Sequence, residues 1–112
     1  MIQILHNPRC SKSRAGVKYL EDKGVDFEVI SYLKEPLKRE QLQDILNKLD
    51  MKPSDLIRKK ETIYKELNLK EASEDELLDA MVANPKLIER PIVINGNKAV
   101  VARPDSEIEK VL

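Results

Sequence analysis

The first third of the chain alternates short apolar segments with one amphipathic segment, and this order constrains the fold most strongly. Residues 1–5 are apolar and predict a buried strand, which an Asn-Pro pair ends. A helical pattern follows from Ser11, and Gly24 is typical of a helix C-terminus. The segment 26–33 is rich in β-forming residues and predicts a second strand. A strand, a helix and a strand in this order normally form a right-handed crossover between parallel strands.

The middle of the chain predicts helices. Leucine and isoleucine recur within 42–49 at the spacing of one helix face. A shorter helix is predicted in 51–59, and a Ser-x-x-Glu capping box predicts another in 73–85. The polar stretch 59–72 between them is expected to be held to the rest of the chain by three apolar side chains, Tyr64, Leu67 and Leu69.

The last part of the chain predicts a hairpin and a helix. Asn95-Gly96, the strongest two-residue hairpin signal, separates the apolar segments 91–94 and 99–101, so antiparallel strands are expected. A final helix is predicted from about Asp105. The resulting α/β order is β-α-β, inserted helices, then β-β-α. By analogy of fold, a mixed four-stranded sheet with such an insertion is thioredoxin-like, and residues 1–112 are expected to form a single domain.

The composition excludes several classes of protein. Acidic and basic residues are balanced at 20 each, without the basic excess that nucleic-acid binding requires. No apolar run is long enough for a membrane span, and the N-terminus lacks signal-peptide features, so we expect a cytoplasmic protein. One cysteine cannot form an internal disulfide. With a single histidine beside it, a zinc site is not expected.

Cys10 lies where the first helix is predicted to begin. Unpaired N–H groups and the helix dipole stabilise a thiolate there and lower the pKa of the thiol. Arg9, Lys12 and Arg14 add positive charge, and a protonated His6 would add more. The alternative is that Cys10 is a small buried apolar residue. Its position between a proline-broken strand and a helix start favours a reactive thiol.

The residues that follow Cys10 restrict its chemistry. The third residue after it is Ser13, which cannot resolve a mixed disulfide, so a redox cycle requires an external thiol. A phosphatase-type loop would carry arginine six residues after the cysteine, where this chain has Gly16. For His6, a structural hydrogen bond to the turn is as consistent with the sequence as a part in catalysis.

Three arginines are candidates for binding an anion. Arg58 lies at the end of a short predicted helix, whereas Arg90 and Arg103 each precede a proline, which holds the preceding residue extended. A thioredoxin-like fold commonly has a cis-proline before its third strand, and Pro91 is the candidate. The planar guanidinium suits tetrahedral oxyanions. Any single arginine could instead pair with one of the many acidic residues at the surface.

Four separated motifs resemble one protein family. HNPRCSKSR, LIRKKE, NPKLIERPIVI and VVARPD, in this order and spacing, resemble the glutaredoxin-dependent arsenate reductases, and most closely a short subgroup without a C-terminal extension. The resemblance covers nearly the whole chain and implies a thioredoxin-like fold with Cys10 as nucleophile. It also implies that Arg58, Arg90 and Arg103 form an oxyanion site. His6 and Ser13 are then expected to lie nearby and to help stabilise the thiolate.

The resemblance also implies a mechanism. In the family the thiolate attacks arsenate and displaces water, glutathione attacks the adduct, and glutaredoxin then reduces the mixed species so that arsenite leaves. Arsenate is therefore the implied substrate, glutathione the co-substrate and glutaredoxin the partner, without a metal or bound cofactor. The better-known enzymes follow the arginine and lysine of the middle motif with asparagine, whereas this chain has Lys60 and then Glu61.

Two other functions are open at this point. Spx-type proteins are related, share the fold and bind RNA polymerase as regulators. They typically use a Cys-x-x-Cys switch, which Ser13 removes here. The second alternative is a thiol oxidoreductase that acts on another substrate, such as a glutathione adduct.

Overall fold

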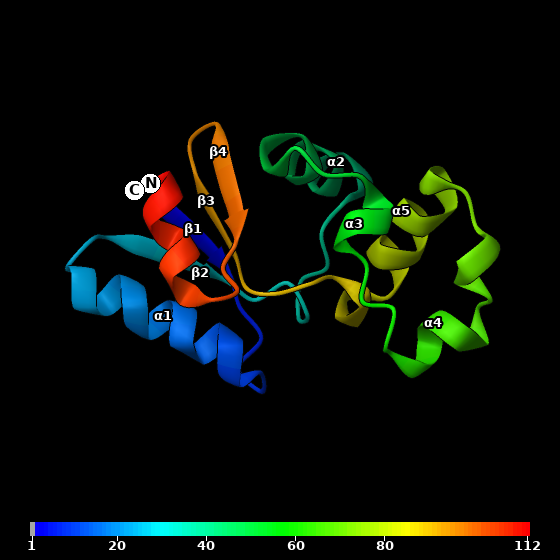
Figure 1. Ribbon diagram of the computed structural model, residues 1–112, viewed down its shortest axis with the longest axis horizontal. Coiled ribbons are helices and arrows are strands. Elements are labelled where there is room, and N and C mark those ends of the chain that lie inside the picture. Colours follow the sequence, from blue (N-terminus) through cyan, green and yellow to red (C-terminus); the bar gives the residue numbers. More distant parts are fainter. Residues whose placement is uncertain (1) are drawn as a thin grey trace. The chain divides into compact units, whose positions relative to one another are not determined.

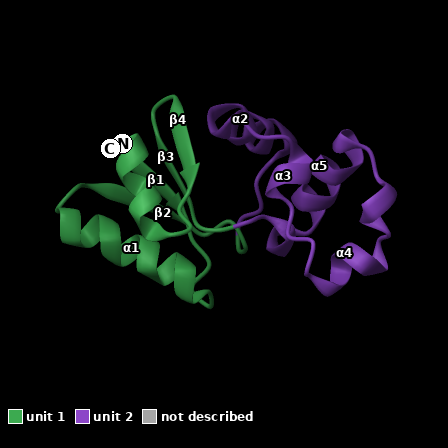
Figure 2. Cartoon of the chain, in the orientation of Figure 1, with its two compact units in different colours: residues 1–34, 90–112 green, residues 35–89 purple. Residues whose placement is uncertain are grey.

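The computed structural model describes residues 2–112 (Figure 1). The chain forms two compact units (Figure 2): residues 1–34 with 90–112, and residues 35–89. The single domain expected from the sequence stays a prediction.

The first unit is built on a four-stranded mixed sheet in the order β2-β1-β3-β4 (Figure 1). Strand β1 (Ile2–Leu5) pairs in parallel with β2 (Phe27–Ile30), and helix α1 (Ser11–Lys23) connects the two. Strand β3 (Ile92–Asn95) pairs antiparallel with β1 and with β4 (Lys98–Val101). The predicted parallel crossover, C-terminal hairpin and mixed sheet are therefore confirmed.

As predicted, one glycine ends α1 and another lies in the turn of the hairpin. Gly24 has a φ of 69°, and its N–H donates to the carbonyl of Glu21 at 3.0 Å. Gly96, in the β3–β4 turn, has a φ of 62°. Glycine adopts this left-handed conformation without the steric cost of a Cβ, so both signals mark the chain reversals correctly.

The core of the first unit combines side chains of the sheet, α1 and the C-terminal segment. One cluster of buried residues in this core consists of Ile4, Leu20, Val93, Ala102, Ile108 and Val111. The C-terminal segment η3 (Asp105–Val111) is a 3₁₀ helix, not the α-helix that its apolar spacing suggested. Ile108 and Val111 are three residues apart, which fits the three residues per turn of a 3₁₀ helix equally well.

Helix α1 approaches Pro91 closely at Gly16. A Cβ at position 16 would lie 3.1 Å from Pro91 Cγ and 3.2 Å from Ile4 Cδ1, so a larger side chain has no room. We expect Gly16→Val to lower the free energy of unfolding in urea by about 1–3 kcal/mol through overpacking. Glu21→Val, exposed on the same helix, controls for the helix cost of a β-branched residue. Equal losses for the two variants would contradict the close packing.

The second unit is helical. Its α-helices are α2 (Arg39–Leu49), α3 (Pro53–Leu56), α4 (Thr62–Glu66) and α5 (Glu74–Ala83), with 3₁₀ turns η1 (Leu69–Glu71) and η2 (Pro85–Leu87). The periodic face predicted for α2 is buried at Leu42, Ile45 and Leu46. The predicted capping box of α5 is also confirmed, because Ser73 and Glu76 each accept a hydrogen bond from the other's backbone N–H.

The polar stretch between α3 and α5 differs in part from the prediction. Leu69 is buried, but Leu67 is 48% exposed, so its predicted packing is wrong. Asn68, between them, has a φ of 53°, and this left-handed residue turns the chain after α4. The turn is local geometry that the apolar spacing alone could not reveal.

Candidate active site

Cys10 occupies the N-cap of α1, as predicted. Its backbone is extended, with φ −97° and ψ 122°, and its carbonyl accepts the N–H of Arg14 at 3.0 Å. The thiol is a free cysteine and is partly exposed. A nucleophile at this position can therefore be reached from solvent while it faces the first N–H groups of the helix.

The surroundings of the sulfur favour the thiolate. Burial by itself raises the pKa of Cys10, but hydrogen bonds from the Ser13 N–H, the Arg90 side chain and the Lys12 N–H outweigh it. The pKa of Cys10 is consequently below its ordinary value. Arg103 adds a guanidinium nitrogen, Nη2, at 4.0 Å from Sγ. This is the arrangement that lowers the pKa of reactive cysteines in general.

The sheet topology explains why two arginines meet near one sulfur. Arg90 lies two residues before β3 and Arg103 two residues after β4, so the antiparallel hairpin holds both at the same end. At that end the N–H of Ala102 donates a hydrogen bond to the carbonyl of Pro91 at 2.9 Å, which extends the pairing of the two strands. Strand β1, antiparallel to β3, finishes there as well and leads into Cys10.

The two X-Pro bonds at this end are both cis. The Arg90–Pro91 bond is cis, which confirms the prediction for Pro91. The Arg103–Pro104 bond is cis as well, although the sequence analysis predicted only an extended residue there.

His6 and Ser13 form a hydrogen-bonded pair beside the cysteine turn. His6 Nδ1 lies 2.6 Å from Ser13 Oγ, and the N–H of Asn7 donates to the same oxygen at 2.9 Å. Burial, and then the charge of Arg14, lower the pKa of His6. The lowered pKa disfavours the protonated imidazolium, and the supporting role predicted for His6 stays a prediction. Its contact is the structural hydrogen bond that the sequence allowed.

Asn7 is a supporting residue that the sequence analysis did not single out. Its carbonyl accepts the N–H of Cys10 and its Oδ1 accepts the N–H of Arg9, both at 3.0 Å. Together with its bond to Ser13, these contacts close the turn that presents the thiol. The available signal was the Asn-Pro pair, since asparagine side chains commonly stabilise turns.

Arg14 supports the same turn from outside. It is exposed, and its Nη1 donates to the carbonyl of Pro8 at 2.9 Å. The guanidinium of Arg14 is thus hydrogen-bonded to the backbone that precedes Cys10. The positive charge predicted at this position acts on His6, whose pKa it lowers.

Arg58 lies in the second unit, among contacts of that unit. Its N–H donates to the carbonyl of Leu87 at 2.7 Å, and Ile57 and Ile88 form an antiparallel bridge. Its Nη1 donates to Glu89 Oε1 at 2.8 Å, and Glu89 directly precedes Arg90 in the chain. The assignment of Arg58 to an oxyanion site stays a prediction.

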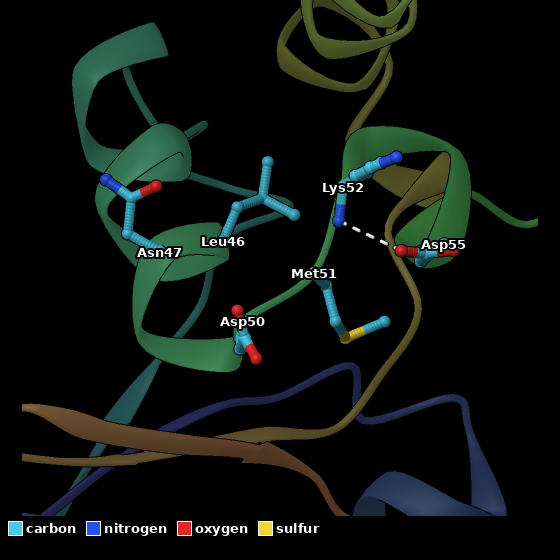
Figure 3. A pocket seen from close by; sticks show the side chains of 6 residues that line it. All are labelled: Leu46, Asn47, Asp50, Met51, Lys52 and Asp55. Atoms are coloured by element: carbon cyan, nitrogen blue, oxygen red, sulfur yellow. Dashed lines mark hydrogen bonds between the residues drawn. The ribbon is translucent and has the colours of Figure 1, made fainter.

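A separate pocket of about 290 Å³ lies between α2 and α3 (Figure 3). It is lined by Leu46, Asn47, Asp50, Met51, Lys52 and Asp55. No predicted site residue is among them. The N–H of Lys52 donates to Asp55 Oδ2 at 3.0 Å across its edge, which is a helix-capping contact of α3 (Figure 3).

Two further features concern residues 2–112 only. Within this range no group of histidine, cysteine and carboxylate side chains is arranged to hold a metal ion. Within the same range no helix combines the length and apolar character needed to cross a bilayer.

The reactivity of Cys10 provides a direct check of this geometry. Because backbone N–H groups and guanidinium nitrogens stabilise the thiolate, the rate of iodoacetamide labelling should reach half its maximum at a lower pH than in the urea-unfolded chain. The unfolded chain is the matched control, since it carries the same sulfur without these contacts. Equal midpoints would contradict a stabilised thiolate.

The fold and this geometry define a thioredoxin-like protein with one activated cysteine between a helix N-terminus and two arginines. The chain belongs to the ArsC family, whose family model matches residues 5–111. It is 46% identical to the arsenate reductase of Neisseria meningitidis serogroup A over 99% of this chain and 97% of that protein. The uncharacterized protein YfgD of Escherichia coli is also 46% identical, over 99% and 96% of the two chains.

A solved structure supports the same assignment. The arsenate reductase from Vibrio cholerae superposes with a TM-score of 0.95 at 40% identity, over 99% of this chain and 97% of that one. The thioredoxin-like fold predicted from the sequence is thereby confirmed.

Proposed function

We propose that this protein is an arsenate reductase that depends on glutathione and glutaredoxin, with Cys10 as the nucleophile. The names of its relatives from Neisseria meningitidis and Vibrio cholerae support arsenate as the substrate. The single observation that carries the proposal is the Cys10 sulfur, whose pKa is lowered by N–H donors and by Arg90, with Arg103 at 4.0 Å.

In the proposed first step the thiolate attacks the arsenic atom of arsenate. A sulfur–arsenic bond forms, one arsenic–oxygen bond breaks, and the oxygen leaves as water after it takes up protons. Arg90 and Arg103 are suited to neutralise the negative charge on the remaining arsenate oxygens. Each guanidinium can donate two parallel hydrogen bonds to an oxyanion. The same donors stabilise the thiolate before the attack, so the sulfur is negatively charged when the oxyanion arrives.

The proposed reduction then requires two thiols from outside the chain. Glutathione attacks the arsenic adduct and displaces a second oxygen as water. Glutaredoxin supplies the other thiol, which attacks the glutathione sulfur, so that the two thiols end as a disulfide and arsenic passes from +5 to +3. Water then hydrolyses the bond between Cys10 Sγ and arsenic, which releases arsenite and restores the thiol. Ser13 cannot take either role, since its hydroxyl is buried and bonded to His6 and Asn7. Neither a metal nor a bound cofactor takes part in this scheme, and the cytoplasm is the proposed location because its glutathione pool keeps thiols reduced.

Arsenate-dependent oxidation of NADPH tests the proposal. The wild-type protein is mixed with arsenate, glutathione, glutathione reductase and glutaredoxin, and absorbance of NADPH is followed. We expect turnover that stops when either glutathione or glutaredoxin is omitted. Absence of turnover, in a mixture in which a known arsenate reductase is active, would contradict the proposal.

The same mixture separates the two alternatives. A thiol oxidoreductase of another specificity would consume NADPH with a glutathione mixed disulfide but not with arsenate. An Spx-like regulator would be retained on immobilised RNA polymerase and would show neither activity. The buried, hydrogen-bonded Ser13 argues against a disulfide switch of that kind.

A further inference from the structure

The turn that carries Cys10 has an unbalanced positive charge. Over the whole chain the acidic and basic residues are equal in number, at 20 each. Residues 1–20 nevertheless contain no acidic residue, and the basic residues among them are Arg9, Lys12, Arg14 and Lys18. Two of these are bonded within the first unit, because Arg14 donates to the backbone of its own turn and Lys18 pairs with Asp22 at 3.2 Å.

Arg9 and Lys12 are the other two cations, and they flank the thiol. Both are exposed, and within residues 2–112 neither side chain forms an ion pair. Arg9 directly precedes Cys10, and the N–H of Lys12 donates to the Cys10 sulfur. Two solvated cations therefore lie beside the reactive atom, and in the described part of the chain no carboxylate neutralises them.

Helix stability does not explain this charge. The first turn of α1 contains no acidic residue, whereas the first turn of α5 contains Glu74, Asp75 and Glu76. Cations near a helix N-terminus oppose the helix dipole, so Lys12 lies where it weakens α1. A negatively charged reactant that approaches Cys10 would gain from the same charge.

We propose that Arg9 and Lys12 bind the carboxylates of glutathione while its thiol reacts at Cys10. This inference rests on the proposed function, in which glutathione is the co-substrate. Glutathione is a tripeptide whose thiol lies between two terminal carboxylates. When its sulfur reaches the arsenic bonded to Cys10, the carboxylates come within reach of the residues beside Cys10. Exposed ion pairs are individually weak, so the two cations favour an anionic thiol over a neutral one and still allow the product to leave.

Exchange between Cys10 and a disulfide tests this recognition without arsenate. The Cys10 thiolate attacks one sulfur of the disulfide, a mixed disulfide forms, and the other half leaves as a thiolate. The two probes are glutathione disulfide, which is anionic, and hydroxyethyl disulfide, which is neutral. Mass spectrometry follows the mixed disulfide, and the ratio of the two rate constants is compared between variants. A change in the thiolate fraction affects both rate constants equally and leaves this ratio unchanged.

Arg9→Gln and Lys12→Gln should each lower the ratio about two- to fivefold at an ionic strength of about 0.1 M, the range of one exposed ion pair. The loss should shrink at about 1 M salt, because dissolved ions screen exposed charges. Lys18→Gln is the matched control, since it removes the same charge from an exposed position of α1 and should leave the ratio unchanged. Circular dichroism during heating verifies that each variant folds.

An unchanged ratio in Arg9→Gln or in Lys12→Gln, or an equal loss in Lys18→Gln, would overturn the inference. The proposed function would then still stand if the wild-type protein reduces arsenate. A wild-type protein that shows the expected dependence on Arg9 and Lys12 but does not reduce arsenate would overturn the proposed function alone.

Discussion

Replacing Cys10 with serine will abolish arsenate-dependent oxidation of NADPH and leave the fold intact. A serine hydroxyl stays protonated near neutral pH, so neither the surrounding N–H groups nor Arg90 can convert it into the anion that attacks arsenic. The N-cap of α1 has no side-chain cap in the wild-type protein, and serine is a preferred N-cap residue. We therefore expect the free energy of unfolding to be unchanged or to rise by about 0.5–1 kcal/mol.

Two measurements check this prediction. The coupled NADPH assay reports turnover, and urea unfolding followed by circular dichroism reports stability. Cys10→Ala is the matched control, because it also lacks the nucleophile but provides no hydrogen-bond acceptor for the helix. Serine should give a stable, inactive protein and alanine a slightly less stable, inactive one. Turnover retained by either variant would remove Cys10 from the assigned role.

Replacing Arg90 with alanine should produce the second largest loss of activity. Arg90 donates to the Cys10 sulfur, and its charge helps to lower the pKa of the thiol. Its removal should raise that pKa and also remove a proposed ligand of the oxyanion. We expect kcat/KM for arsenate to fall roughly a hundredfold, the usual order for loss of a charged donor at a reacting centre. Arg90→Lys should recover only part of the loss, because an ammonium group lacks the planar fork.

Lys98→Ala is the control for the removal of one positive charge from the hairpin. Lys98 is exposed and pairs with Asn95 at the turn, the opposite end of the hairpin from Arg90. Its loss should change neither kcat/KM nor the pH midpoint of iodoacetamide labelling, whereas Arg90→Ala should raise that midpoint. Unchanged kinetics and an unchanged midpoint for Arg90→Ala would exclude Arg90 from the site.

The elements of the fold were predictable where short-range chemistry decides the structure. The periodic leucines and isoleucines of α2, the capping box of α5 and the glycines at positions 24 and 96 each act within one or two turns of chain. The 3₁₀ character of η3 was not predictable, because Ile108 and Val111 fit both helix types. The exposure of Leu67, which precedes the left-handed residue Asn68, was not predictable from the polarity of the stretch.

The site was predictable to the extent that sequence neighbours define it. The place of Cys10 and the N–H donors that follow it come from the strand, the proline and the helix start. The pairing of Arg58 with Glu89 in particular could not be foreseen, since Glu89 lies 31 residues away along the chain. The hydrogen bonds of Asn7 were missed, because an Asn-Pro pair predicts a turn but does not indicate which N–H groups the asparagine will accept.

The pairing of β3 with β4 fixes the positions of Arg90 and Arg103 relative to each other. Arg90 lies before β3 and Arg103 lies after β4, so both are at one end of the hairpin. The turn at Gly96 is at the opposite end. Moving the pairing of the strands by a single residue would turn every side chain of the shifted strand to the opposite face. A change at the turn that shifted this pairing would therefore be expected to displace Arg90 and Arg103, although Gly96 lies at the opposite end of the hairpin.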